Sequence, residues 1–128
     1  MPAAVADFTI EQGATWVQDI WWEDETGTPM VLTDYIARFQ ARSSLSDVGT
    51  LVDLTTENGG IEIDGPAGKI TITMDADATA ALDWPAGRHV QSTGIYQLEL
   101  ESPTGFVTRL LKGNLTLDPE VVHPVEVP

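Results

Sequence analysis

The sequence contains no cysteine, which excludes thiol nucleophiles, cysteine-based zinc sites and a disulfide framework together. Basic residues are also scarce: six lysines and arginines stand against 20 aspartates and glutamates, giving a net charge of −14. Such a charge repels a phosphate backbone, so we expect no nucleic-acid partner. The acidic residues are spread along the chain, a pattern typical of a solvated surface, and a surface that matches a basic partner is the alternative.

Long hydrophobic runs are absent as well. No segment approaches the roughly 20 apolar residues that span a bilayer, and the opening MPAAVADF lacks the basic start and apolar stretch of a signal peptide. We therefore expect a protein that is made in the cytoplasm and has no membrane partner. A length of 128 residues fits one domain that buries a core without a metal or a disulfide.

Alternation of apolar and polar residues dominates the chain and predicts half-buried β-strands. The clearest runs are 61–64, 69–74 and 96–101, and the run 35–42 alternates in the same way. The turn sequence at 102–105 connects the run 96–101 to another at 107–111, which predicts a hairpin. Glycine-rich turns are expected at 57–60 and 65–68.

The first part of the chain has two further strand-like runs, at 7–11 and 16–22, which we expect to form a hairpin. One short helix is predicted over 75–82, capped by Asp75 or Asp77 and ended by the Trp84-Pro85 pair.

These elements predict an all-β fold with seven or eight strands and one short helix. We expect an antiparallel immunoglobulin-like β-sandwich, and a small β-barrel is the alternative. Residues 1–118 are expected to form the single β-sandwich domain, followed by an extended C-terminal tail at 119–128.

The residues that could act in catalysis or bind a metal do not form a recognisable site. His89 and His123 stand beside no serine in a nucleophile setting, and a domain this small rarely builds the deep cleft that a pair of catalytic carboxylates needs. The run 75–79 has the carboxylate spacing that begins a calcium loop but lacks the loop's central glycine and closing glutamate, so helix capping explains it better. We expect no enzyme activity, no catalytic residue, no cofactor and no metal.

Tryptophan provides the strongest site-like signal. Trp21 and Trp22 are adjacent on a predicted strand, so their side chains should point to opposite faces unless a bulge intervenes. The outward ring is a candidate for binding a partner or a sugar, and cover by a neighbouring loop or subunit is the structural alternative. Arg38 and Arg42 share one face of their strand and are expected to pair with local carboxylates.

The tail is the second candidate for partner binding. Gly113 lets the preceding strand bend or bulge, and Pro119, Pro124 and Pro128 prevent the tail from continuing a sheet or forming a helix. We expect an extended, exposed segment that lies across a neighbouring subunit or adds to the edge of a partner's sheet. A frayed terminus is the alternative. The residues proposed to make the contact are Val121, Val122, Val125 and Val127.

Five stretches together resemble a family of small virion proteins of tailed bacteriophages and prophages. They are ADFTIEQGAT (6–15), GTPMVLTDY (27–35) leading to QAR (40–42), TAAL (79–82), GIYQLEL (94–100) and GFVTRLLKGNLTLDPEV (105–121). The family resembles the virion-anchoring domain of upper baseplate proteins, which are β-sandwiches that hold fibres or receptor-binding proteins to a tail. Those proteins have a fibre-forming region after this domain, whereas the present sequence stops at Pro128.

The resemblance implies a structural virion protein of the tail or baseplate region that acts as an adaptor or anchoring module. Its implied partners are other virion proteins of the tail, baseplate or fibres, together with copies of itself in a homo-oligomer. The implied location is the virion, assembled in the cytoplasm of a host bacterium. A carbohydrate-binding module of a host-adhesion device is the alternative function, with an exposed tryptophan as its binding platform.

Overall fold

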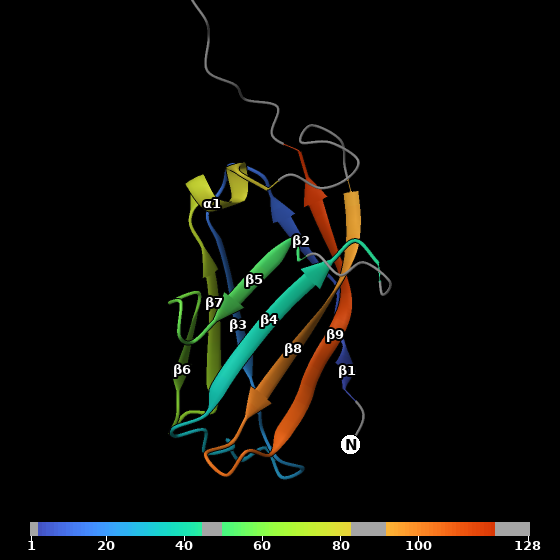
Figure 1. Cartoon of the computed structure of the whole chain (residues 1–128). Helices are drawn as coiled ribbons and strands as arrows, with labels where there is room; N and C mark the ends of the chain where they lie inside the picture. Colours follow the sequence, from blue (N-terminus) through green and yellow to red (C-terminus); the bar gives the residue numbers. More distant parts are fainter. Residues whose placement is uncertain (1–2, 45–49, 83–91, 120–128) are drawn as a thin grey trace, which may run out of the picture.

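The computed structural model describes residues 3–44, 50–82 and 92–119. Two β-sheets face each other, and one short helix lies at one end of the pair (Figure 1). The elements are β1 (Ala4–Val5), β2 (Phe8–Glu11), β3 (Trp16–Trp21), β4 (Ile36–Arg42), β5 (Val52–Thr55), β6 (Ile61–Asp64), β7 (Lys69–Met74), α1 (Ala76–Ala80), β8 (Ser92–Glu101) and β9 (Val107–Asp118).

The larger sheet, sheet A, has the strand order β1-β9-β8-β4-β5, and β2 also pairs with β9. β8 and β9 form the predicted hairpin across the turn at 102–105, where Gly105 has a φ of 89°. In β4, the side chains of Ala37, Phe39 and Ala41 are buried and the alternate ones are partly exposed. The predictions of this hairpin and of the strand near 35–42 are confirmed.

One edge of sheet A corrects the prediction of an antiparallel sandwich. β1 and β2 run parallel to β9, in the registers Val5↔Lys112 and Ile10↔Leu117, so the sheet is mixed. An antiparallel direction is imposed when a tight turn connects two paired strands. No such turn connects these strands to β9, because most of the chain lies between them.

The prediction that the first two strand-like runs form a hairpin is wrong. β2 belongs to sheet A, whereas β3 pairs with β7 in the other sheet. Between them, the Gln12 N–H donates to the carbonyl of Asp118 at 2.9 Å, and Gly13 then has a φ of 86°. The chain therefore crosses from one sheet to the other here, because a left-handed residue turns it away from β9.

The smaller sheet, sheet B, is antiparallel with the order β3-β7-β6. β6 and β7 form a hairpin across the predicted turn at 65–68, in which Gly68 has a φ of 63°. A Cβ at Gly68 would lie 2.7 Å from the carbonyl oxygen of Trp22, so the turn needs glycine for its space as well as for its φ.

Both sheets contribute to one apolar core. Four rings lie at its centre, with centroid separations of 5.0 Å for Phe39 and Tyr96, 5.2 Å for Phe8 and Tyr96, and 5.7 Å for Trp16 and Phe39. Each such pair adds about 0.5–1.5 kcal/mol beyond the burial of its area. Two open sheets over a shared core make the fold sandwich-like, and the barrel alternative is wrong because the sheets do not close.

The helix α1 is shorter than predicted. Asp75 caps it, with the carboxylate accepting a hydrogen bond from the Ala78 N–H at 2.8 Å, and Ala81 ends it. Buried Thr79 connects it to the crossing between the sheets: its hydroxyl accepts from the Gly13 N–H at 3.0 Å and donates to the Ala14 carbonyl at 2.8 Å. Within the described ranges, no helix has the length and apolar character to cross a membrane.

Gly113 permits a close backbone approach in sheet A. A Cβ there would lie 1.9 Å from the carbonyl oxygen of Ala6, in the link between β1 and β2. The pairing of β8 with β9 is irregular at a different place. The register shifts between Leu98 and Glu99 of β8, which pair with Leu111 and Arg109 of β9. Gly113 is therefore required for space beside the N-terminal segment, and the predicted bend or bulge lies earlier in the strand.

Candidate functional site

The outer face of sheet B presents a stripe of side chains along its edge strand β3. Val17, Asp19 and Trp21 alternate with residues that point inward, and their cross-strand partners on β7 are Thr73, Thr71 and Lys69. Val17 and Trp21 are 54% and 57% exposed. In the described part of the chain, no strand pairs with the other side of β3, so its backbone edge is open beside this stripe.

Polar groups border the exposed indole. The ammonium of Lys69 lies 5.6 Å from the ring centroid of Trp21, within the range of a cation–π contact. The same ammonium is 3.9 Å from the carboxylate of Asp19, which also accepts a hydrogen bond from the Thr71 hydroxyl at 2.8 Å. These contacts leave Trp21 exposed and open to a partner.

Trp22 lies on the opposite side of the strand, as predicted. Its ring is partly buried and packs against the core. Its backbone N–H donates to the Gly68 carbonyl at 2.8 Å, and its backbone carbonyl accepts from the Met30 N–H at 2.9 Å. The structure therefore does not bring Trp21 and Trp22 to one surface. Trp22 fits a structural role.

Seven other residues named in the sequence analysis lie outside the described part of the chain. These are the tail residues Val121, Val122, Val125 and Val127, together with His89, His123 and Trp84.

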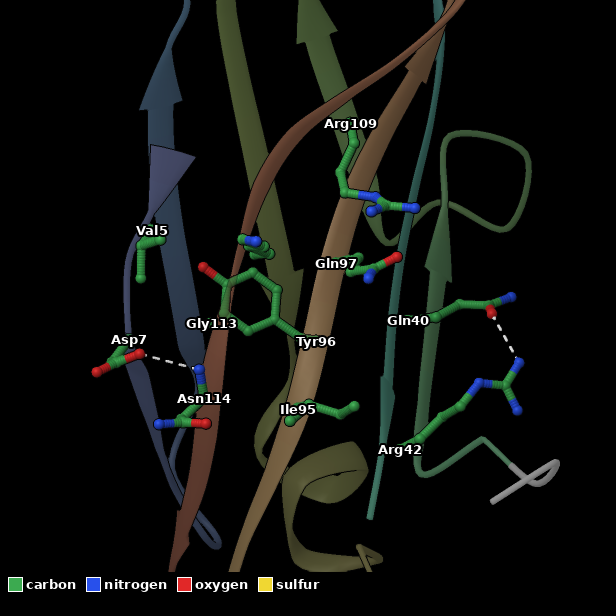
Figure 2. A pocket seen from close by; sticks show the side chains of 11 residues that line it. Val5, Asp7, Gln40, Arg42, Ile95, Tyr96, Gln97, Arg109, Gly113 and Asn114 are labelled. Carbon is green, nitrogen blue, oxygen red and sulfur yellow. Dashed lines mark hydrogen bonds between the residues drawn. The ribbon is translucent and has the colours of Figure 1, made fainter. Parts of the chain in front are cut away.

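The outer face of sheet A holds a second surface, which the sequence analysis did not predict. Side chains of β4, β8 and β9 form rows across the sheet, and the central row is Gln40↔Gln97↔Lys112, continued by Val5 of β1. A groove of about 700 Å³ lies over these rows. Figure 2 shows the side chains that line it. It is lined by Val5, Asp7, Gln40, Arg42, Ile95, Tyr96, Gln97, Arg109, Lys112, Gly113 and Asn114.

Three cations stand around this groove. Arg42 donates to the amide oxygen of Gln40 at 3.2 Å, and Arg109 lies 3.8 Å from the carboxylate of Glu99 (Figure 2). Within the described ranges, Lys112 has no carboxylate at ion-pair distance, and its side chain is exposed. The carboxylate of Asp7 accepts a hydrogen bond from the Asn114 N–H at 2.9 Å, so it already has a structural partner.

Tyr96 forms part of the groove floor. Its hydroxyl donates to the Ala6 carbonyl at 2.5 Å, although its ring belongs to the core. Burial, and then the negative charge of Asp7, raise the pKa of Tyr96 to about 12. The phenol therefore stays protonated and remains a donor over the physiological range.

The sequence alone predicts only part of this second surface. The alternation of β4 places Arg38 and Arg42 on one face, and Arg38 pairs with Glu101 at 3.4 Å as expected. The alignment of Arg42 with Ile95 and Asn114 depends on the registers of three strands, which alternation leaves open.

In the segments that the structure describes, no group of three or more His, Cys, Asp or Glu side chains is placed to hold a metal ion. No protein-family model and no curated protein matches the chain.

Proposed function

We propose that this chain is a structural protein of a bacteriophage virion, in the tail or baseplate region, where it docks fibres or neighbouring components. The observation that carries the proposal is the exposed Trp21 beside Val17 on the open edge strand β3. Tryptophan is enriched among the residues that dominate binding energy at protein interfaces, and an open strand edge can pair with an added strand.

The five sequence stretches that resemble tailed-phage virion proteins support the placement in a virion. On this proposal the partners are tail, baseplate or fibre proteins and further copies of the chain, and assembly takes place in the host cytoplasm. The protein acts by binding, without catalysis and without a cofactor. We also propose an immunoglobulin-like topology for the sandwich, supported by two open sheets over one core. The strand connections of an experimental structure test that topology.

The first experiment measures binding of the purified chain to purified phage tails by co-sedimentation. Trp21→Ala should weaken binding at least about tenfold, because hot-spot tryptophans contribute about 2 kcal/mol or more. Val31→Ala is the matched control, since Val31 is a large exposed apolar residue outside the β3 stripe. Equal binding of the wild type and the Trp21 variant would contradict a docking role for this face.

The same indole favours one alternative, a carbohydrate-binding module. An exposed ring bordered by Asp19, Lys69 and Thr71 offers a stacking face with hydrogen-bonding groups around it. Titration with bacterial surface glycans would then change the tryptophan fluorescence in the wild type and leave that of Trp21→Ala unchanged. If neither protein responds, the carbohydrate alternative is wrong.

A further inference from the structure

The turn between β5 and β6 carries the chain from sheet A to sheet B and contains the pair Asn58-Gly59 (Figure 1). Both residues are exposed, and Gly59 has a φ of 83°. An asparagine amide is attacked most easily by the next backbone nitrogen when glycine follows, because glycine has no Cβ to hinder the approach. The turn is therefore a candidate site for a spontaneous covalent modification.

Hydrogen bonds hold the amide of Asn58 in one orientation. Its oxygen accepts from the backbone N–H groups of Thr55 and Gly60, both at 3.0 Å, and its nitrogen donates to the Asp53 carbonyl at 3.1 Å. The backbone N–H of Asn58 donates to the Thr55 hydroxyl at 2.9 Å. All these bonds are local to the turn, so a local opening can break them without unfolding the sheets.

The backbone nitrogen of Gly59 is the group that can attack this amide. In the described part of the chain, no acceptor takes a hydrogen bond from the Gly59 N–H. A Cβ built at Gly59 would meet nothing within 4 Å, so water and base have access to the nitrogen. The attack would join neighbouring residues, which gives it the high effective concentration of an intramolecular reaction.

We propose that Asn58 is a site of spontaneous deamidation and that opening of its hydrogen-bonded turn limits the rate. Base removes the proton of the Gly59 N–H, and the nitrogen forms a bond to Cγ of Asn58. The bond from Cγ to Nδ2 then breaks, and Nδ2 leaves as ammonia after it takes a proton from water. Water opens the resulting succinimide at either carbonyl, which gives aspartate or isoaspartate. Water is consumed and ammonia is released, with no change of oxidation state.

Deamidation loosens the connection between the sheets. The product lacks the Nδ2 donor, so an oxygen of the new carboxylate faces the Asp53 carbonyl in its place. Isoaspartate also lengthens the backbone of the turn. Gly60 leaves little room for adjustment, because a Cβ there would lie 2.7 Å from Cδ2 of Leu54 and its carbonyl accepts from the Thr73 N–H at 2.9 Å. The amide hydrogens of β5 should therefore exchange faster in the modified chain.

Ageing of the full-length protein in mildly alkaline buffer, followed by peptide mass spectrometry, tests the site. The peptide with Asn58 should gain the mass difference between a hydroxyl and an amino group, and it should separate into aspartate and isoaspartate forms. Asn114, the other asparagine of the chain, is the internal control, because Leu115 follows it within β9. It should stay unmodified. A sample unfolded in urea should convert faster at Asn58 than the folded protein.

Thr55→Val tests the control of the rate by the turn, because it removes the hydroxyl that accepts from the Asn58 N–H and keeps the shape of the side chain. The rate at Asn58 should rise about two- to tenfold. Thr55→Ser keeps a hydroxyl and should restore the wild-type rate. Thr104→Val is the matched control, since the Thr104 hydroxyl contacts only Ser102 among the described residues, in another exposed turn.

An Asn58 that stays unmodified in the folded wild type while it converts in urea would overturn the site. Equal rates in the folded and unfolded wild type, or in Thr55→Val and the wild type, would overturn the control by the turn. The proposal does not depend on the virion assignment, because the reaction needs only the chain and water.

Discussion

At the scale of single residues, Tyr96 connects the core to the N-terminal edge of sheet A. Its ring stacks between those of Phe8 and Phe39, and its hydroxyl donates to the carbonyl of Ala6. The side chain of Asp7 adds a second bond across the same edge, to the Asn114 N–H. Ala6 lies against Gly113 in the segment that connects β1 to β2. Hydrogen bonds as well as packing therefore hold this segment in place.

Tyr96→Phe should lower the free energy of unfolding by about 1–2 kcal/mol, because the Ala6 carbonyl loses its hydroxyl donor while the ring is kept. Urea unfolding measures this change. Tyr35→Phe is the matched control, since Tyr35 is the other tyrosine and is half-buried. Equal losses in the two variants would contradict a specific role for the Tyr96 hydroxyl.

Tyr96 also predicts a loss of stability in alkali. Its pKa is about 12 in the folded protein, whereas a tyrosine in an unfolded chain titrates near its ordinary value of 10.0. The contribution of the protonated phenol is complete below pH 10, and it decreases as the pH rises toward 12, because the unfolded state loses the proton first. The melting temperature of the wild type should fall more steeply over this window than that of Tyr96→Phe, and parallel profiles would be inconsistent with the assignment.

At the scale of elements, α1 and the crossing between the sheets form one unit through Thr79. The Thr79 hydroxyl bonds to Gly13 and Ala14, where the chain leaves sheet A for sheet B. α1 has only 5 residues, and a helix this short is not stable by itself. Its stability therefore depends on these contacts.

Thr79→Val keeps the shape of the side chain and removes both bonds to the crossing, which leaves the Gly13 N–H without its acceptor. We expect a loss of about 1–3 kcal/mol in the free energy of unfolding. Hydrogen exchange should be faster at Gly13 in particular. Asp77→Ala, in the first turn of the same helix, is the control and should leave Gly13 unchanged. Unaltered exchange in Thr79→Val would contradict this account of the junction.

The elements differ in how far the sequence predicts them. Alternation around Phe39 and Leu98 is clean because one side of each strand faces the core, so the strands and the buried sides are predictable. The pairing of Ile10 with Leu117 joins distant parts of the chain, and no local pattern specifies it or its parallel direction. The opposite orientation of Trp21 and Trp22 follows from the strand period, whereas the groove around Lys112 requires the registers of three strands.

At the scale of the whole molecule, the two outer faces differ in chemistry. In the described part of the chain, sheet B presents a tryptophan and a valine beside an open strand edge, and sheet A presents a groove lined by charged and amide side chains. On our proposal, the face with Trp21 binds another virion component.

The most direct test of the virion assignment is quantitative mass spectrometry of purified phage particles released by cells that carry the gene. We predict peptides of this chain at a fixed ratio to the tail proteins, retained after the tails are separated from the heads. Particles that contain the tail proteins but no peptide of this chain would contradict the assignment.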